Sequence, residues 1–389
     1  MPRRRSLVLF GLGYAVLGLN VAAVLVYGPL YIRAVDPTRA DLLTGLLFAL
    51  PSLTAFVGYN LWGALYDRYP RPRPYVLASL GSEALFFTLF LAADSATALV
   101  ALATTFALIS TALFPVSKAW GTLEWEDSKG RIVGALHASE SAGWGAASLA
   151  GAAICWWRPS ELEAMHFIFT LCWIASVGAF AVMGVLFPRQ AAHHDRTPAE
   201  RGSLLQELAG LYGRPAVLRL ALFLFVLTTA NVAFFSYFSL YLCQHLGGSA
   251  AVLGLSMAGA TIVGTLLFPV YGWLADVRGR RGLLIGATVA YVAFYAVLCV
   301  LSDPRAVAVL MTVPLYPAIR VGTSAWLADL TGERDRAGGM GLLEGVASLA
   351  SVVGPVAGWA CVHWLGYTWL PLVPLALLLP GICLLAALR

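Results

Sequence analysis

Long apolar runs separated by short polar segments divide the chain from one end to the other. The runs cover residues 7–32, 41–66, 74–93, 96–118, 132–155, 164–187, 216–243, 250–271, 282–301, 305–328, 338–361 and 366–388. Each is close to the ~20 residues that a helix needs to cross a bilayer. Because lipid offers no hydrogen-bond partner to a bare backbone, we predict that every run is an α-helix. The pattern therefore predicts an all-α membrane protein with twelve transmembrane helices.

The longest polar segment, residues 188–215, divides the runs into two sets of six. We predict two pseudo-symmetric six-helix bundles, residues 1–187 and 216–389, joined by a cytoplasmic linker at 188–215. Apolar side chains within the linker fall on one face of a helix: Leu204, Leu205, Leu208, Leu211 and Tyr212. This spacing predicts an amphipathic helix that lies in the membrane interface.

A charged motif occurs once in each half, between the second and third runs of that half. The first copy reads Gly63-Ala64-Leu65-Tyr66-Asp67-Arg68, and the second, 209 positions later, reads Gly272-Trp273-Leu274-Ala275-Asp276-Val277-Arg278-Gly279-Arg280-Arg281. Charges this dense cannot lie in hydrocarbon, so each copy is predicted to be a tight loop at the membrane surface. The motif resembles the loop signature of the major facilitator superfamily, although Val277 and Pro70 depart from it. The resemblance implies that Gly63, Asp67, Arg68, Gly272, Asp276, Arg280 and Arg281 help to close the cytoplasmic side.

Two further features repeat between the halves. Pro115 and Pro317 lie in matching runs and each precedes a cation by three residues, which predicts a kinked helix in both halves. The fifth and eleventh runs carry small residues at regular spacing: Gly134, Gly143 and Gly151, and Gly341, Gly354, Pro355 and Gly358. These resemble the glycine-rich motif of drug/proton antiporters, although the fifth run lacks its Gly-Pro pair. Small residues let helices approach closely.

Composition and charge agree with a membrane protein. Hydrophobic residues make up 60% of the chain and charged residues 12%, about half the share of an ordinary soluble domain. With the N-terminus inside, the predicted cytoplasmic segments and helix ends hold 20 Lys and Arg, against 4 outside. By the positive-inside rule, both termini are cytoplasmic and the chain is a multi-pass protein of the inner (plasma) membrane. The net charge of +5 does not indicate nucleic-acid binding, because the Arg residues lie in short loops.

Ionisable residues inside the runs are the strongest functional signal, since a charge at the bilayer centre costs ~2.5–3.5 kcal/mol. They are Glu83, Lys118, His137, Glu140, Arg320 and Glu344. Arg320 and Glu344 lie at similar predicted depths on consecutive helices, so we predict a buried salt bridge between them. Glu140 has no obvious partner at its depth and is our first candidate for a proton carrier. Glu83 is the second, and Glu344 and His137 are further candidates.

By family resemblance, the first, fourth, seventh and tenth helices of such transporters line a central cavity. The polar or charged residues that these runs offer to a substrate are Asn20, Tyr27, Lys118, Asn231, Tyr237 and Arg320. Several large aromatic residues in this region would suit an apolar ligand.

The sequence contains no phosphate-binding loop, no H-E-x-x-H and no G-x-S-x-G motif, and its six Cys have no metal-ligand spacing. We therefore predict neither an enzyme nor a cofactor or metal site. The leading interpretation is a monomeric secondary active transporter that exports small, largely apolar compounds with proton coupling. Two alternatives remain open: an importer of a metabolite or anionic nutrient, and a non-transporting membrane sensor.

Overall fold

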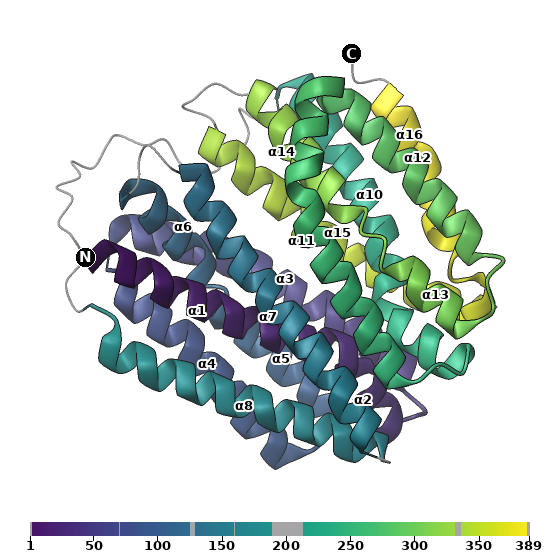
Figure 1. Cartoon of the computed structure of the whole chain (residues 1–389), viewed down its shortest axis with the longest axis horizontal. Coiled ribbons are helices and arrows are strands. Elements are labelled where there is room, and N and C mark those ends of the chain that lie inside the picture. The colour runs from purple at the N-terminus through teal and green to yellow at the C-terminus, as the bar shows by residue number, and fades with distance from the viewer. Residues whose placement is uncertain are drawn as a thin grey trace. The chain divides into compact units, whose positions relative to one another are not determined.

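The computed structural model describes residues 2–69, 71–124, 129–158, 160–188, 213–330 and 336–386. These ranges are helical between short turns and contain no strand (Figure 1). Eleven helical segments are long and apolar enough to cross a membrane, and α7 (Lys129–Trp157), rich in Gly, Ala and Ser, is the twelfth membrane helix. The predicted all-α fold with twelve transmembrane helices is confirmed.

The first six helices match the first six apolar runs. They are α1 (Pro2–Ala22) continued by the π-helix η1 (Ala23–Tyr27) and α2 (Gly28–Val35), then α3 (Ala40–Arg68), α4 (Pro72–Ala93), α5 (Ala96–Ser110) with α6 (Leu113–Glu124), α7, and α8 (Glu161–Leu186).

The second six follow the same plan. They are α10 (Pro215–Leu240) continued by the π-helix η3 (Tyr241–His245), then α11 (Ala250–Arg278), α12 (Arg280–Leu298), α13 (Pro304–Met311) with α14 (Tyr316–Leu330), α15 (Arg336–Leu365), the short 3-10 helix η4 (Tyr367–Trp369), and α16 (Leu372–Ala386).

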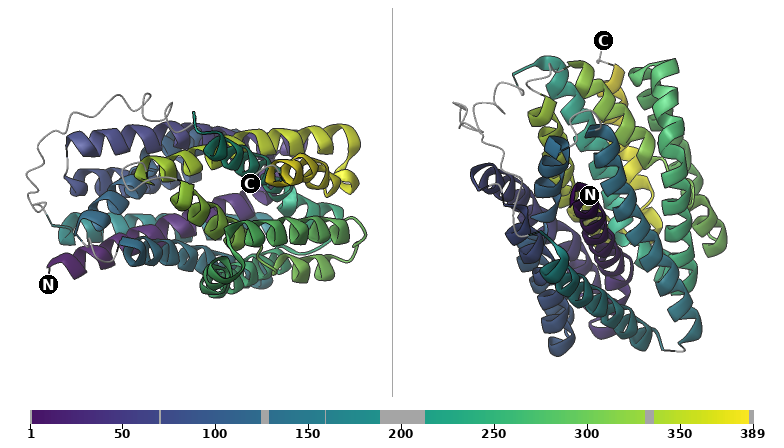
Figure 2. Two further views of the ribbon diagram at one scale, coloured as in Figure 1. Left: turned by 90° about the horizontal axis from the view of Figure 1, so that it is seen from above. Right: turned by 60° about the vertical axis from the view of Figure 1, so that its left-hand side comes forward.

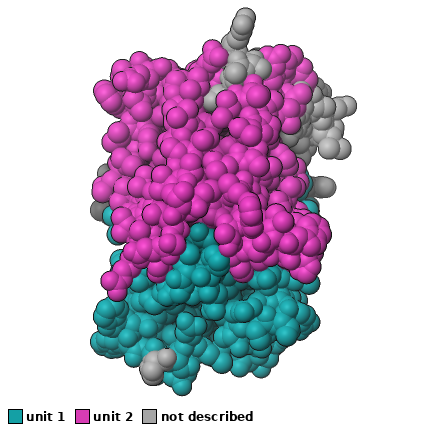
Figure 3. Space-filling model, turned by 90° about the vertical axis from the view of Figure 1, so that its right-hand side faces the viewer, with its two compact units in different colours: residues 1–192, 237–262 teal, residues 193–236, 263–389 magenta. Residues whose placement is uncertain are grey.

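Internal contacts group the chain into two compact units, coloured separately in Figure 3. Unit 1 holds residues 1–192 and 237–262, and unit 2 holds residues 193–236 and 263–389. The end of α10, η3 and the first part of α11 therefore group with unit 1. The division into bundles 1–187 and 216–389 stays a prediction. The amphipathic helix predicted within 188–215 lies outside the described residues.

Unit 1 is built from pairs of long helices that lie side by side (Figure 1 and Figure 2). The main pairs are α1 with α7, α3 with α5, and α4 with α8. Between them Phe10, Tyr14 and Leu17 of α1 are buried against Leu80 of α4 and Leu113 of α6. In unit 2, α12 packs against α14 and α16, and α14 packs against α15.

The predicted interruptions are present in both halves. The fourth helix breaks between Ser110 and Leu113, so Pro115 stands in the first turn of α6. The tenth breaks between Met311 and Tyr316, so Pro317 stands in the first turn of α14. Proline is tolerated there because the first N–H groups of a helix need no internal acceptor. Each half thus contains a broken helix where the sequence predicted a kink.

The predicted loop at residues 272–281 is shorter than expected. Helix α11 continues through Gly272 and Asp276 to Arg278, and α12 begins at Arg280. The one residue between them, Gly279, has φ +79°, a conformation that favours glycine. The charged motif is therefore a helix end and a one-residue turn.

Candidate functional site

A buried polar cluster joins three helices of unit 1. The amide Nδ2 of Asn20 on α1 donates to Glu83 Oε2 on α4 at 2.9 Å and to Ser176 Oγ on α8 at 2.8 Å. Ser176 in turn donates to the carbonyl of Cys172 at 2.8 Å. The side chain of Asn20, proposed from sequence as a cavity residue, is thus buried and bound to Glu83, one of the proton-carrier candidates.

The cluster can hold the Glu83 carboxyl with or without its proton. Asn20 Oδ1 is buried and has no hydrogen-bond partner among the described residues. A protonated Glu83 is a donor, and half a turn of the Asn20 amide would bring that oxygen into position to accept. The neutral donors around Glu83 do not require it to be charged.

A second acidic group lies on α7 in a different environment. Glu140 Oε2 is 3.1 Å from Nδ1 of His137, one turn earlier on the same helix, and both side chains are close to 30% exposed. The expectation that Glu140 lacks a partner is wrong: His137 is that partner. The ring of Tyr14 on α1 meets the His137 ring edge-on, and its hydroxyl hydrogen-bonds Ser117 on α6 at 2.8 Å. Two proton-coupling candidates from the sequence are therefore in direct contact.

Glycines bring α1 and α7 together beside this pair. A Cβ on Gly18 would lie 2.2 Å from the carbonyl oxygen of Glu140, and one on Gly143 would lie 1.9 Å from that of Ala15. Only residues without a side chain allow this approach. Among the motif glycines in unit 2, a Cβ on Gly354 would lie 2.9 Å from the carbonyl oxygen of Thr229 on α10, and Pro355 and Gly358 are buried beside it on α15. Gly134 faces open space, and the surroundings of Gly341 are not described.

Tyr27 occupies a narrow slot within unit 1. Its ring is buried, and its hydroxyl donates to the carbonyl of Ser148 on α7 at 3.1 Å. Gly151 on α7 and Gly254 on α11 form the walls, since a Cβ at either position would lie 2.3 Å from the phenol. Tyr27, a cavity candidate from the sequence, does not line an open space in this conformation.

Two hydroxyls at the end of α10 form hydrogen bonds with backbone carbonyls of α3 and of η1, which ends at Tyr27. Tyr237 donates to the carbonyl of Asp41 at 2.8 Å, and Ser239 donates to the carbonyl of Val26 at 2.7 Å. Val26 lies in the π-helix η1, and π-helical turns are frequently found at functional sites. Tyr237 is thus a packing contact in this conformation, and Ser239 is a contact that the sequence analysis missed.

The sequence candidates in unit 2 are more dispersed. Asn231 accepts a hydrogen bond from Tyr295 on α12 at 2.7 Å and donates to Leu227 at 2.9 Å. Arg320 and Glu344 lie on helices that pack together, but both residues are exposed. The energetics of a buried pair therefore do not apply to them, and the salt bridge itself stays a prediction. Lys118 in unit 1 is half-buried.

The second copy of the charged motif forms an ion-pair cluster. Arg280 Nη2 is 3.5 Å from Asp276 Oδ1, and its Nε is 3.1 Å from Asp329 Oδ2 at the end of α14. That Nε–H is not aimed at an oxygen, so the contact is electrostatic rather than a hydrogen bond. Asp276 and Asp329 are 74% and 55% exposed, so each pair contributes at most ~1 kcal/mol. Arg281 is exposed.

The remaining motif residues can be placed only in part. Asp67 and Arg68 end α3, and their side chains are outside the described residues. A Cβ on Gly63 would make ordinary contact with Pro115, at 3.9 Å, and one on Gly272 would meet nothing. Within the described ranges no group of three or more His, Cys, Asp or Glu gathers as metal ligands.

The sequence matches the profile of the Major Facilitator Superfamily over residues 10–322 and 244–389. The chain belongs to this superfamily of membrane transporters. It is 34% identical over 120 residues to the class C tetracycline resistance protein of Escherichia coli, a stretch that spans 29% of each protein.

Solved structures of superfamily members share the fold over the whole chain. A bacterial homologue of the human lysosomal transporter Spinster, inward-facing and unoccupied, has a TM-score of 0.72 at 15% identity and covers 100% of this chain and 95% of its own. The nucleoside transporter NupG has a TM-score of 0.73 at 14% identity, and the match covers 100% of this chain and 98% of NupG. The human organic anion transporter MFSD10 (TETRAN) has a TM-score of 0.70 at 17% identity, and the match covers 99% of this chain and 100% of MFSD10. At these identities the similarity concerns the fold alone.

Sequence reasoning missed several contacts and residues that the structure brings to the sites. His137 could have been recognised as the partner of Glu140, because residues three apart on a helix are neighbours. Asp329 could have been recognised as an acid directly after the tenth run, at a helix end predicted to be cytoplasmic. Ser176, Ser239 and Gly254 carry no local signal, since their contacts are distant in sequence.

Proposed function

We propose that this chain exports small, largely apolar compounds in exchange for protons. The observation that carries the proposal is the His137–Glu140 pair, a partly exposed acid and base in contact on a transmembrane helix. His is the side chain whose ordinary titration falls between pH 5 and 8, and a carboxylate beside it can exchange a proton with it. Intramembrane ionisable residues mark substrate and proton pathways in transporters.

The surroundings of the pair can convert a change of charge into movement. The pair lies where α1 and α7 touch backbone to backbone, at Gly18 and Gly143. A proton that arrives or leaves changes the electrostatic balance beside this contact. Since α1 also carries Asn20, the same helix contacts Glu83 of α4, which provides a second place for a proton.

The partial relative supports the direction of transport. The class C tetracycline resistance protein is named for resistance to a small organic compound, and resistance by a superfamily transporter is consistent with export. The likeness covers 29% of the chain, so the substrate itself is left as a chemical class.

We further propose that both termini are cytoplasmic in the inner membrane and that the functional unit is a monomer. In that orientation Asp276, Arg280 and Arg281, with Asp67 and Arg68 in the first copy, help to close the cytoplasmic side. Asp329 joins them through Arg280 at 3.1 Å. Weak exposed ion pairs suit a closure that must open in every cycle, because each is easily broken.

A second candidate function rests on Arg320. This cation is exposed on α14, about one turn after the break between α13 and α14, and could bind an anionic nutrient during import. Broken helices in transporters often lie beside the substrate site.

Flux measurements with purified protein in liposomes distinguish the two functions. Each of a panel of cationic, neutral and anionic compounds is offered with and without an imposed pH gradient. Export of apolar compounds driven by the gradient supports the proposal. Selective uptake of anions, abolished by Arg320→Gln, would favour the importer.

A further inference from the structure

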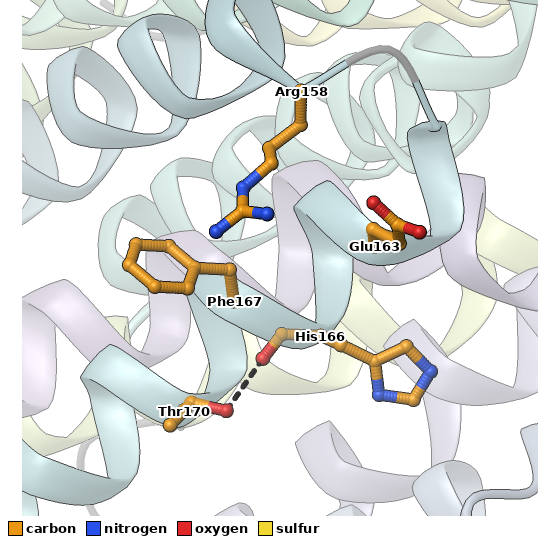
Figure 4. Close-up of a pocket in the computed structure, with 5 residues that line it drawn as sticks. All are labelled: Arg158, Glu163, His166, Phe167 and Thr170. Carbon is orange, nitrogen blue, oxygen red and sulfur yellow. Dashed lines mark hydrogen bonds between the residues drawn. The ribbon is translucent and has the colours of Figure 1, made fainter.

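A surface hollow of about 410 Å³ lies where α7 ends and α8 begins. It is lined by Arg158, Glu163, His166, Phe167 and Thr170, which Figure 4 shows around the first turns of α8. The guanidinium of Arg158 lies 5.2 Å from the ring centroid of Phe167. In the described part of the chain, neither the Arg158 nor the Glu163 side chain has an oppositely charged partner. The hollow therefore presents one free cation and one free anion.

His166 also lines the hollow, and its side chain is already engaged. Its Nε2 lies 3.3 Å from Asp94 Oδ1, which also accepts from the hydroxyl of Tyr31 at 2.8 Å. Asp94 holds this position with φ +42°, a left-handed conformation uncommon for residues other than glycine. The position of His166 is thus fixed, while Arg158 and Glu163 remain available to a ligand in the hollow.

The hollow lies at the level of the membrane boundary. Helix α8 is a membrane span that begins at Glu161. The residues just before the hollow, Trp156 and Trp157, are 78% and 88% exposed. Tryptophans placed in this way are typical of the interface between lipid and water. A ligand that reaches the hollow from the membrane must therefore have a polar head at this depth.

An exposed apolar stripe on α8 leads from the hollow towards the bilayer centre. It consists of Phe167, Leu171 and Ile174, spaced by three or four residues. Gly178 follows one turn later, where a Cβ would meet nothing within 4 Å. The stripe offers a shallow track for an acyl chain.

We propose that this hollow and stripe bind a phospholipid whose head carries both a phosphate and a primary ammonium. Arg158 takes the phosphate and Glu163 takes the ammonium, which donates hydrogen bonds that a trimethylammonium cannot. The acyl chains lie along the stripe from Phe167. A headgroup with no cation leaves Glu163 facing an anionic lipid, so the site ranks phosphoethanolamine above phosphocholine and phosphoglycerol heads.

Native mass spectrometry of the full-length protein tests this ranking. Delipidated protein is offered equal amounts of the three phospholipids with identical chains, and retained lipid is counted. We expect preferential retention of phosphoethanolamine lipid. Arg158→Gln should lower the retention of phosphoethanolamine lipid about fivefold, since one Lys or Arg near an anionic lipid head contributes about 1 kcal/mol to binding. Glu163→Gln should remove the preference over phosphocholine.

The matched control is Arg305→Gln, which removes an exposed Arg at the start of α13 that does not line the hollow. It should leave retention unchanged, and thermal unfolding should show that all three variants remain folded. Water-soluble phosphoethanolamine should bind far more weakly than the lipid, because it cannot use the stripe. Equal retention of the three lipids, or wild-type retention by Arg158→Gln and Glu163→Gln, would overturn the proposal.

Discussion

Gly151→Ala places a methyl group in the slot that holds Tyr27. The new Cβ would lie 2.3 Å from Cζ and from the hydroxyl oxygen of Tyr27, where ordinary contact begins at 3.4 Å. Either the α7 backbone at position 151 or the Tyr27 ring must therefore move by about 1 Å. The ring cannot retreat, because it is buried, its hydroxyl bonds Ser148, and Gly254 forms the opposite wall. Overpacking of this kind costs ~1–3 kcal/mol.

Gly145→Ala is the matched control on the same helix. Its Cβ would make ordinary contact with Thr261 at 3.8 Å. Both substitutions gain the same ~1 kcal/mol of helix propensity, so the difference between them isolates the clash. We expect Gly151→Ala to be less stable than Gly145→Ala by ~1–3 kcal/mol. This lowers the equilibrium constant for the conformation with Tyr27 in its slot by a factor of about 5 to 150.

Thermal unfolding of the purified variants measures the difference in stability, and transport assays show its effect on the cycle. The double variant Gly151→Ala with Tyr27→Ala should recover part of the loss, because removing the ring removes the clash. Equal stability and equal transport of Gly151→Ala and Gly145→Ala would refute the reasoning. Additive losses in the double variant would refute it as well.

Three further predictions concern the charges and the topology. Asp276→Ala and Asp329→Asn should each reduce transport while expression stays near wild type, because the exposed pairs with Arg280 contribute little to folding; wild-type transport by both would contradict their role in closure. Arg320→Ala or Glu344→Gln alone should impair transport and the double variant should regain part of it, whereas purely additive losses would exclude the pair. A cysteine at position 199, in place of Ala199, should resist an impermeant thiol reagent in intact cells, and labelling there would reverse the proposed orientation.

Much of the fold could be predicted because it depends on composition along the chain. Runs long enough to cross a bilayer predicted twelve helices, and the structure agrees with their ends to within seven residues, the largest difference being at the end of α11. Pro115 and Pro317 marked the two broken helices, since proline cannot stand inside an uninterrupted helix without cost. The one-residue turn at Gly279 was harder to foresee, because the charges around it indicated a longer loop.

The sites were less predictable because they depend on contacts between distant residues. Glu140 looked isolated by depth alone, although His137 lies one turn away. Tyr27 was assigned to a cavity from its polar group, yet the glycine walls of its slot come from two other helices. A glycine in an apolar run, such as Gly254, does not reveal which side chain will fill its space.

The central claim is that Glu140, with His137, couples proton movement to export. Its most direct test compares wild type and Glu140→Gln in liposomes, with substrate exchange at equal pH and uphill transport under an imposed pH gradient. The glutamine keeps the size and can still hydrogen-bond His137, but it cannot carry a proton. We predict that the variant retains exchange and loses gradient-driven accumulation. Accumulation at the wild-type rate in Glu140→Gln would contradict the account.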